Sequence, residues 1–142
     1  MAASSCIFCK IARGDLAASI VYEDADRIAF LDHRPVFPGH CLLVPRTHYA
    51  TLVDIPDDQI GPLFTCAKRI SRAVEGSLKA DGFFVAINNR VSQSVPHVHV
   101  HVVPRRKKDG LRGFFWPRVA YSSDAEMERT RAAIAAELES LK

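Results

Sequence analysis

The run Pro96-His97-Val98-His99-Val100-His101-Val102-Val103 constrains the fold more than any other segment of this chain. Its period of two is that of a β-strand, on which alternate side chains point to opposite faces. The three histidines therefore share one face, while the valines face a hydrophobic core. Alternate histidines on a strand stand about 6.6 Å apart and the outer pair about 13 Å.

This spacing limits what the histidine row can do. Zinc binds imidazole nitrogen at about 2.0–2.1 Å, so one ion cannot take all three histidines from a regular strand. The row is either a polar strand face or a set of imidazoles with neighbouring tasks, as nucleophile, proton donor or phosphate contact near neutral pH. Three imidazoles buried without partners would be costly, which favours the second interpretation.

The remaining pattern predicts five short strands and two helices. Strands are expected at residues 19–23, 27–32, 41–44, 82–87 and 95–103, the last two close enough to pair as a hairpin. Apolar residues from Ile60 to Leu78 recur at spacings of three and four, which predicts an amphipathic helix with Pro62 in its first turn. Ser123 and Glu126 have the form of a capping box before a second helix. Because the helices do not alternate strictly with strands, the predicted class is α+β with a mostly antiparallel five-stranded sheet.

The length of 142 residues suits a single domain, residues 1–142. Its core is expected in about residues 6–104, followed by a basic and aromatic segment and a C-terminal helix in 105–142. The formal net charge of +3 is unevenly distributed. The segment Arg105–Arg118 holds six basic residues and one acid, a local +5 that leaves −2 for the rest. Such a segment can meet phosphate, nucleic acid or an anionic membrane.

The cysteines and the opening residues indicate the compartment. The chain opens without a basic region followed by an apolar core, so no secretory signal is expected, and no apolar run is long enough to span a membrane. Four cysteines are few for a disulfide scaffold, which favours a reducing cytoplasm. There, Cys41 and Cys66 are expected to be buried thiols, whereas Cys6 and Cys9 are expected to bind metal or to be redox-active.

The Cys6-Ile7-Phe8-Cys9 motif is open to three interpretations, namely a zinc site, a redox dithiol or two unused thiols. A thioredoxin-like motif should lie between a strand and a helix, and no strand precedes this one. Zinc needs two more ligands. His48 and one histidine of the row would complete a closed structural set of two cysteines and two histidines.

These motifs closely resemble the histidine-triad (HIT) family of nucleotide hydrolases and transferases, in its zinc-bearing bacterial-type branch. The family pattern His-φ-His-φ-His-φ-φ matches residues 97–103. Further matches, in family order, are Cys6-Ile7-Phe8-Cys9-Lys10-Ile11, Phe30-Leu31-Asp32, Pro38-Gly39-His40, Pro45-Arg46-Thr47-His48 and Gln93-Ser94-Val95. The resemblance covers about residues 6–104. It implies a HIT-like fold and a homodimer in which two five-stranded sheets meet as ten.

The resemblance also implies a role for each matching residue. His99, the middle histidine, corresponds to the nucleophile that attacks the α-phosphorus of a nucleotide, and covalent catalysis by neutral imidazole agrees with that role. Substrate-binding roles are implied for nine further residues. Phe8, Ile11 and Phe30 resemble the walls of the base pocket, Asp32 resembles the carboxylate that receives the ribose hydroxyls, and His40 resembles a histidine behind the triad. His101 resembles a phosphate contact, Gln93 and Ser94 resemble donors to the phosphate or the leaving group, and Asn88 resembles the family's asparagine in the strand before the triad. The implied ligands of a structural zinc are Cys6, Cys9, His48 and His97.

The implied function is a nucleotide hydrolase or nucleotidyl transferase, a HIT-type phosphoramidase acting at the α-phosphorus of a purine nucleotide derivative. Two alternatives stay open. One is a nucleotide-binding regulatory or interaction module with little turnover. The other is a dinucleoside-polyphosphate hydrolase or phosphorylase, which shares the α-phosphorus step and differs in the leaving group.

Two segments depart from the family pattern. The loop Asn88–Gln93 is short and lacks the glycine that follows the asparagine in typical members, so Arg90 is a candidate side-chain contact to phosphate. The tail Arg105–Arg118 is either a solvated turn with an aromatic plug over the core or a basic flap that attracts polyphosphate at the site exit. We expect its start near the strand end that holds His101. Phosphate is then the favoured anion, while membrane and nucleic acid are disfavoured.

Overall fold

The computed structural model describes residues 3–112 and 118–141. The chain divides into two compact units, residues 1–109 and 110–142, and each is described by itself. In the described ranges, no helix is long and apolar enough to cross a membrane. In chain order, the elements are α1 (Ile7–Arg13), β1 (Ile20–Glu23), β2 (Arg27–Leu31), β3 (Cys41–Pro45), the 3-10 turn η1 (Leu52–Asp54), α2 (Asp57–Leu78), β4 (Gly82–Ala86), β5 (Val100–Arg105) and α3 (Asp124–Ser140).

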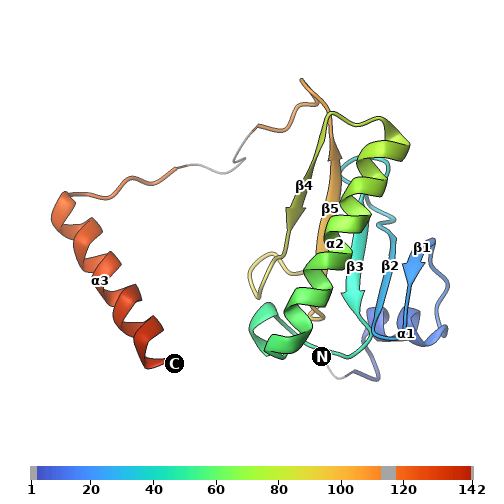
Figure 1. Cartoon of the computed structure of the whole chain (residues 1–142), viewed down its shortest axis with the longest axis horizontal. Coiled ribbons are helices and arrows are strands. Elements are labelled where there is room, and N and C mark those ends of the chain that lie inside the picture. The colour runs from blue at the N-terminus through green and yellow to red at the C-terminus, as the bar shows by residue number, and fades with distance from the viewer. Residues whose placement is uncertain (1–2, 113–117, 142) are drawn as a thin grey trace. The chain divides into compact units, whose positions relative to one another are not determined.

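The five strands form one antiparallel sheet in the order β1-β2-β3-β5-β4 (Figure 1). Strands β4 and β5 pair as expected, with Ala86 opposite His101 and Gly82 opposite Arg105. This arrangement confirms the α+β class and the antiparallel sheet. The structure adds a third helix, α1, that the sequence pattern did not predict.

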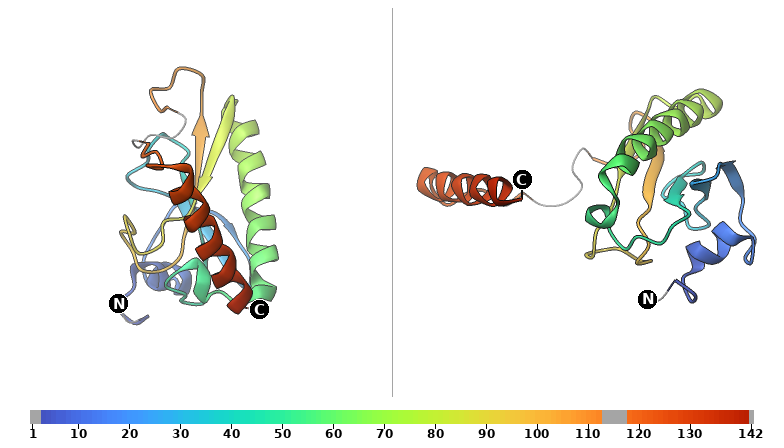
Figure 2. Two further views of the ribbon diagram at one scale, coloured as in Figure 1. Left: turned by 90° about the vertical axis from the view of Figure 1, so that its left-hand side faces the viewer. Right: turned by 60° about the horizontal axis from the view of Figure 1, so that its bottom comes forward.

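The sheet separates two hydrophobic clusters, and the views of Figure 2 show α1 and α2 on its opposite sides. On the α2 side, Val98, Val100 and Val102 pack with the buried face of α2. On the α1 side, Phe8 and Ile11 pack with alternate residues of β2 and β3, including Leu42. His101 lies opposite Leu42 in the ladder and therefore faces the α1 side, because paired residues share a face. The valines thus supply the core under α2, as the alternation predicts.

Helix α1 is short and is held by its buried face. Its N-cap residue Cys6 makes no side-chain cap, and Gly14 ends the helix at φ 83°, in the left-handed region that glycine adopts without steric cost. The Arg46 guanidinium donates to the carbonyl oxygens of Ala12 and Asp24. This link ties the end of α1 to the turn between β1 and β2.

Helix α2 begins earlier than the apolar periodicity indicated. It starts at Asp57, and Asp57 and Asp58 occupy its first turn, where carboxylates interact favourably with the helix dipole. Pro62 consequently lies in the second turn, which corrects the prediction of the first. Since proline has no N–H, the helix lacks the bond that residue 62 would donate to the Asp58 carbonyl.

The second unit contains α3, which has the expected cap at Ser123 but not the complete capping box, because the Glu126 carboxylate bonds Ser122 instead of the Ser123 backbone. The Ser123 hydroxyl oxygen accepts a hydrogen bond from the Glu126 backbone N–H at 3.1 Å. The Glu126 carboxylate accepts from the backbone N–H and hydroxyl of Ser122. The expected aromatic plug falls on residues 113–117, which lie outside the described ranges.

Candidate active site and metal centre

The histidine row is only partly a strand. The structure begins β5 at Val100 rather than at residue 95, so His97 and His99 precede the sheet ladder. The neighbouring strand β3 ends at Pro45, which has no N–H to donate across the ladder. The Pro45 carbonyl instead accepts from Nε2 of the His97 ring at 2.7 Å, and the Val98 N–H donates to Tyr49. This segment is therefore fixed by loop and ring contacts, which frees the His97 side chain to turn away from the row.

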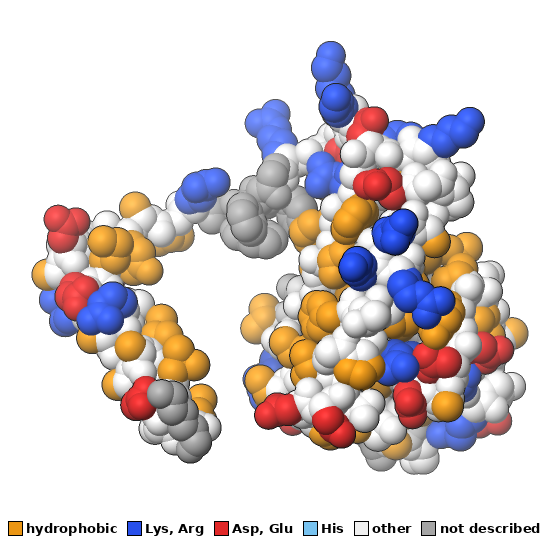
Figure 3. All heavy atoms as spheres, viewed as in Figure 1, with side chains coloured by type: hydrophobic (Ala, Val, Ile, Leu, Met, Phe, Trp, Pro, Cys, Tyr) orange, Lys and Arg blue, Asp and Glu red, His pale blue; other side chains and the backbone are white. Residues whose placement is uncertain are grey.

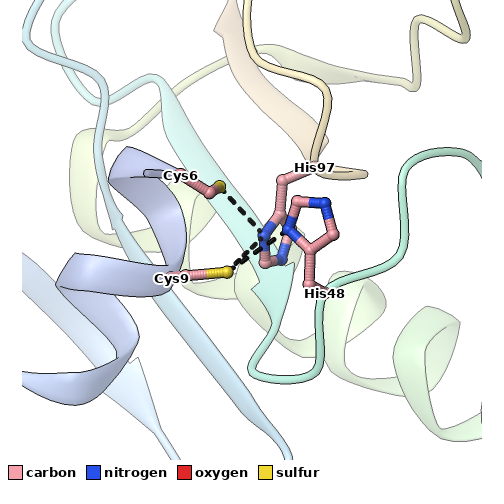
Figure 4. A group of neighbouring side chains, drawn as sticks. All are labelled: Cys6, Cys9, His48 and His97. Atoms are coloured by element: carbon pink, nitrogen blue, oxygen red, sulfur yellow. Dashed lines mark hydrogen bonds between the residues drawn. The ribbon is translucent and has the colours of Figure 1, made fainter. Parts of the chain in front are cut away.

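Four side chains from three parts of the chain converge beside α1 (Figure 4). Cys6 and Cys9 come from the start of α1, His48 from the loop after β3 and His97 from the segment before β5. The Sγ atom of Cys9 lies 3.3 Å from Nδ1 of His48 and 3.5 Å from Nδ1 of His97, and Sγ of Cys6 lies 3.5 Å from Nδ1 of His97. The Cys6, Cys9 and His97 side chains are buried.

This donor set fits zinc in composition and in spacing. Zinc–sulfur bonds of about 2.3 Å and zinc–nitrogen bonds of about 2.05 Å at a tetrahedral angle place the sulfur and nitrogen atoms roughly 3.6 Å apart. The observed 3.3–3.5 Å separations are close to that value. The outer nitrogen of His97 already donates to Pro45, the kind of contact that orients a metal-binding imidazole. Burial raises the pKa of the Cys9 thiol to about 11, so a nearby cation is what would favour two thiolates there.

His97 also positions its neighbour in the row. Its carbonyl oxygen lies 2.8 Å from Nδ1 of His99. A carbonyl only accepts, so Nδ1 of His99 carries the proton, and in the neutral ring Nε2 keeps its lone pair. The ring of Phe8 stands edge-on to His99, with centroids 5.1 Å apart. The His97 backbone thus holds His99 in the tautomer that leaves Nε2 free to act as a nucleophile, and the Phe8 ring packs against it.

The proton positions of His40 and His101 follow from one chain of hydrogen bonds. The Val36 N–H donates to Nδ1 of His40 at 3.1 Å, so the proton of neutral His40 is on Nε2. That Nε2 lies 2.9 Å from Nδ1 of His101, which must then accept. His101 therefore carries its proton on Nε2, a buried atom with no partner within the described residues. The His99 and His101 ring centroids are 4.8 Å apart, so the ring that keeps a lone pair on Nε2 is next to the ring that carries an N–H donor on Nε2.

Burial keeps these imidazoles neutral. It lowers the pKa of His99 and of His40, and it lowers the pKa of His101 to about 4, with a smaller contribution from the neighbouring His99. The Asp32 carboxylate opposes this effect but stands 3.7 Å from Nδ1 of His40, beyond hydrogen-bonding distance. At neutral pH the set therefore offers a neutral nucleophile and a neutral donor.

The residues expected to bind base and ribose lie on the same side of the sheet. Phe8, Ile11 and Phe30 are buried members of one cluster, and the Phe8 and Phe30 rings pack edge to face at 5.4 Å. Asp32 groups with His40 and His101, and its Oδ1 accepts from the backbone N–H of residue 34. The structure thus brings one apolar wall and one carboxylate to the histidines.

The side chains of Asn88 and Gln93, two of the residues expected to bind substrate, form hydrogen bonds with nearby backbone groups. The Gln93 side chain accepts from the Arg90 N–H and donates to the Ala50 carbonyl. The Asn88 amide donates to the Ser92 carbonyl, and Ser94 is exposed. In the described residues, none of the hydrogen bonds of Asn88 and Gln93 goes to a triad histidine. Arg90 and Ser92 take left-handed φ values of 68° and 58°, a conformation typical of the glycine that this loop lacks.

The start of the basic tail does not lie where the sequence placed it. Arg105 ends β5 while His101 is near its beginning, so about 13 Å of strand separate them. Arg105 pairs with Asp109 through both its Nε and a terminal nitrogen, and Arg106 donates to the carbonyls of Leu78 and Lys79 at the end of α2. This turn uses two of its charges to close the fold, which corrects the expectation of a basic flap beginning beside His101.

The groups of the site that could not be predicted from the sequence are backbone N–H and carbonyl groups that bond the histidine rings. The carbonyls of Pro45 and His97 and the N–H of Val36 decide which nitrogen of each histidine carries the proton. Such groups leave no signal in residue type. His40 could be suggested only by the family motif, because 61 positions separate it from His101.

Comparisons with known proteins identify the family of this chain. The family model described as HIT domain matches residues 13–108. An uncharacterised HIT-like protein of Saccharolobus solfataricus is 44% identical over 106 residues, which is 73% of this chain and 76% of the relative. An adenosine 5′-monophosphoramidase of Saccharomyces cerevisiae is 39% identical over 111 residues, covering 76% of this chain and 68% of the relative.

Solved structures show the same fold. A HIT family protein from Bacillus subtilis superposes with a TM-score of 0.83 at 34% identity, covering 93% of this chain and 96% of that one. A zinc-bound histidine triad family protein from Mycobacterium smegmatis gives a TM-score of 0.73 at 38% identity, covering 99% and 100%. The matched domain, the shared fold and the grouping of the histidines lead to one conclusion: this chain belongs to the HIT family.

Proposed function

We propose that this protein is a nucleotide hydrolase or nucleotidyl transferase that works through a nucleotide covalently bound to His99. The observation that carries the proposal is the fixed pair of proton positions in neighbouring rings. His99 has its proton on Nδ1, held by the His97 carbonyl, and His101 has its proton on an unpartnered Nε2. The pair supplies a nucleophile and an anion-stabilising donor without any prior proton transfer.

In the first step, the lone pair of His99 Nε2 attacks the α-phosphorus and the bond from phosphorus to the leaving group breaks. The leaving group departs with the bonding electron pair and takes up a proton. His101 Nε2–H donates to a non-bridging oxygen, where negative charge accumulates. In the second step, water or another acceptor attacks phosphorus, the nitrogen–phosphorus bond breaks, and His99 is regenerated as the neutral imidazole. The acceptor releases one proton to solvent, which balances the proton that the leaving group takes from solvent in the first step. Splitting one displacement into two lowers each barrier.

The preferred substrate class is a purine nucleoside monophosphate joined to a labile leaving group through its α-phosphorus. The yeast relative named an adenosine 5′-monophosphoramidase supports this class. The apolar wall of Phe8 and Phe30 suits a planar base, and the Asp32 carboxylate suits ribose hydroxyls.

We also propose that the Cys6, Cys9, His48 and His97 centre holds a structural zinc ion. A zinc ion there would supply positive charge and crosslink α1, the loop after β3 and the segment before β5. His97 connects the proposed zinc centre to His99. Its ring faces the two cysteines, and its backbone carbonyl accepts from Nδ1 of His99.

A homodimer in which two sheets join through β4 completes the proposal. Strand β4 is at one edge of the sheet, where unpaired backbone groups can accept another strand. Phe83 and Val85 are exposed on it, as is Phe64 on α2. An exposed apolar edge strand of this kind is expected to be covered in solution.

The test is direct detection of the covalent intermediate. The purified protein is mixed with adenosine 5′-phosphoramidate, quenched within milliseconds and mapped by mass spectrometry. We expect an adenylyl adduct on His99 that disappears as AMP forms. His99→Ala should bind AMP without forming an adduct, whereas the control His33→Ala, which changes an exposed histidine, should label normally. Wild-type turnover by His99→Ala would refute the mechanism. AMP binding by a wild type that forms no adduct would instead favour a nucleotide-binding module.

A further inference from the structure

Helix α1 carries side chains of both proposed sites, yet little in its own sequence holds it in place. Cys6 and Cys9 at its start belong to the proposed metal centre, and the Phe8 ring packs against His99. The helix has seven residues and no side-chain cap at its start, and helices of this length are not stable alone in water. Its buried face packs on the sheet, but apolar packing is non-directional. A directional contact is therefore needed to set the position of α1.

The end of α1 shows where such a contact is made. A helix leaves its last four carbonyl oxygens without partners inside the helix. The carbonyls of residues 10 and 11 accept from backbone N–H groups just after the helix. The Ala12 carbonyl instead accepts from a terminal nitrogen of Arg46, 34 positions along the chain. A cation at this end is also favourable to the helix dipole. The Arg46 guanidinium is thus a long-range anchor of the last turn.

Arg46 reaches α1 from a firmly bonded base, the turn between β1 and β2. Its Nε donates to the Asp24 carbonyl at 2.7 Å, and its other terminal nitrogen donates to the Glu23 carboxylate at 2.8 Å. The Asp24 carboxylate in turn accepts from two backbone N–H groups of the turn and from the Tyr22 hydroxyl. Figure 3 shows acidic and basic side chains beside one another at the lower right of the first unit, where β1 and β2 lie in Figure 1. The planar guanidinium therefore joins three acceptors in a fixed geometry.

Arg46 also belongs to the segment that holds the histidine half of the metal centre. The carbonyl of the preceding Pro45 accepts from the His97 ring. The ring of His48, two positions after Arg46, lies against Cys9. Two residues of chain span at most about 7 Å. By holding the end of α1, Arg46 therefore fixes both cysteines relative to the two histidines.

We propose that Arg46 is the positioning residue of α1, and that its bond to the Ala12 carbonyl thereby sets the spacing of Cys6 and Cys9 from the histidines. This inference rests on the proposed zinc centre and deepens it. Donors that are already in place lose less conformational freedom when they bind a ligand. Losing Arg46 should therefore weaken zinc binding, by an amount comparable to the roughly ten- to hundredfold cost of removing groups that orient metal ligands.

The experiment measures the zinc affinity of the purified full chain by competition with a chelator. Arg46→Ala should weaken zinc binding by roughly tenfold or more. Arg46→Lys keeps the charge, but one ammonium group cannot reproduce the guanidinium fork, so it should recover only part of the affinity. Glu23→Gln removes only the exposed ion pair of Arg46 and should stay within about twofold of wild type, because such pairs contribute little.

A matched arginine separates positioning from a general loss of stability. The side chain of Arg105 is about as exposed as that of Arg46, at 22% against 27%, and its carboxylate partner is Asp109 at the end of β5 away from the metal centre. Arg105→Ala should lower Tm and keep the wild-type zinc affinity. Equal zinc affinities in Arg46→Ala and Arg105→Ala would overturn the proposal. If Arg46→Ala does not fold, Arg46→Lys and Arg105→Lys provide the same comparison.

A second measurement does not need the metal. Hydrogen exchange of the zinc-free proteins, followed by mass spectrometry of peptides that contain α1, reports local opening of this helix. Arg46→Ala should increase exchange in α1 more than in α2, whereas Arg105→Ala should not. A wild type that binds no zinc, but whose α1 exchange depends on Arg46, would refute the zinc centre and support the positioning role. Exchange in α1 that Arg46→Ala leaves unchanged would refute the positioning role, whether or not zinc binds.

Discussion

Nε2 of His40 lies 2.9 Å from Nδ1 of His101, and this one hydrogen bond decides which side of the His101 ring donates. The proton of neutral His40 is on Nε2 because its Nδ1 accepts a hydrogen bond from the Val36 N–H. Two rings and a backbone group thus present a single N–H beside His99. The arrangement fixes the polarity of the site before any substrate binds.

Removing the donor at position 40 should therefore lower turnover more than binding. In His40→Ala, the Nδ1 of His101 loses its donor, so the proton of His101 is no longer held on Nε2. If the lost bond, about 1–3 kcal/mol, is felt in the transition state, kcat falls by roughly five- to 150-fold. His40→Gln keeps an N–H donor and should recover part of the rate. The measurement is kcat and KM with adenosine 5′-phosphoramidate, together with Tm to confirm folding. A His40→Ala variant that is folded and fully active would remove His40 from the site.

Acid should destabilise the fold through the buried histidines. Burial lowers the pKa of His101 to about 4, against about 6.5 in an unfolded chain. Between these values the unfolded state binds more protons, so stability is complete above about pH 6.5 and is lost as the pH falls toward 4. For His101 alone, the loss is of the order of 3 kcal/mol.

Urea unfolding at intervals from pH 7.5 to 4.5 measures this slope. His101→Gln removes one of the titrating groups and should flatten the dependence, whereas His33→Gln, at an exposed position, should leave it unchanged. Stability that increases as the pH falls through this window would have the wrong sign for buried neutral histidines.

The metal centre should contribute folding free energy. Wild-type protein is expected to contain about one zinc per chain, and Cys9→Ala should lose it and unfold at a lower temperature. Cys66→Ala is the matched control, because it removes a buried thiol on the other side of the sheet. Elemental analysis and thermal unfolding provide the measurements. Wild-type protein that lacks zinc and gains no stability when zinc is added would contradict the assignment.

The alternation of histidine and valine could be predicted because it depends only on the period of a strand. Val98, Val100 and Val102 are indeed buried under α2. The beginning of β5 could not be predicted, because it depends on the partner strand. Pro45 on β3 has no N–H to offer, so the ladder begins only at Val100.

The other differences have local physical causes. Helix α1 has seven residues and no side-chain cap, so it lacks the length and the capping signal by which a helix is recognised. The charges of Arg105 and Arg106 could be counted from the sequence, but their partners could not. Arg105 pairs with Asp109, and Arg106 donates to the carbonyl oxygens at the end of α2.

The pairing of sheets through β4 should depend on its exposed apolar residues. In the otherwise wild-type chain, Val85→Glu should convert a dimer to a monomer, because it places a charge in an apolar interface. Val53→Glu, at a residue 76% exposed in η1, is the control and should remain dimeric. Light scattering after size-exclusion chromatography reports the mass, and a dimer that survives Val85→Glu would exclude this edge.

The 88–93 loop should show backbone strain that glycine relieves. Arg90 has φ 68°, a conformation that costs a non-glycine residue roughly 1–2 kcal/mol and a β-branched residue more. Arg90→Gly removes this strain from the folded state but also raises the conformational entropy of the unfolded chain. Because the two effects oppose each other, its free energy of unfolding should stay within about 1 kcal/mol of wild type. Arg90→Val should be less stable than Arg90→Gly by at least about 1 kcal/mol. Urea unfolding compares them, with the neighbouring Val91→Gly as the control for chain entropy. If the Arg90 valine and glycine variants are equally stable, the backbone at this position is not strained, and the missing family glycine has no energetic consequence.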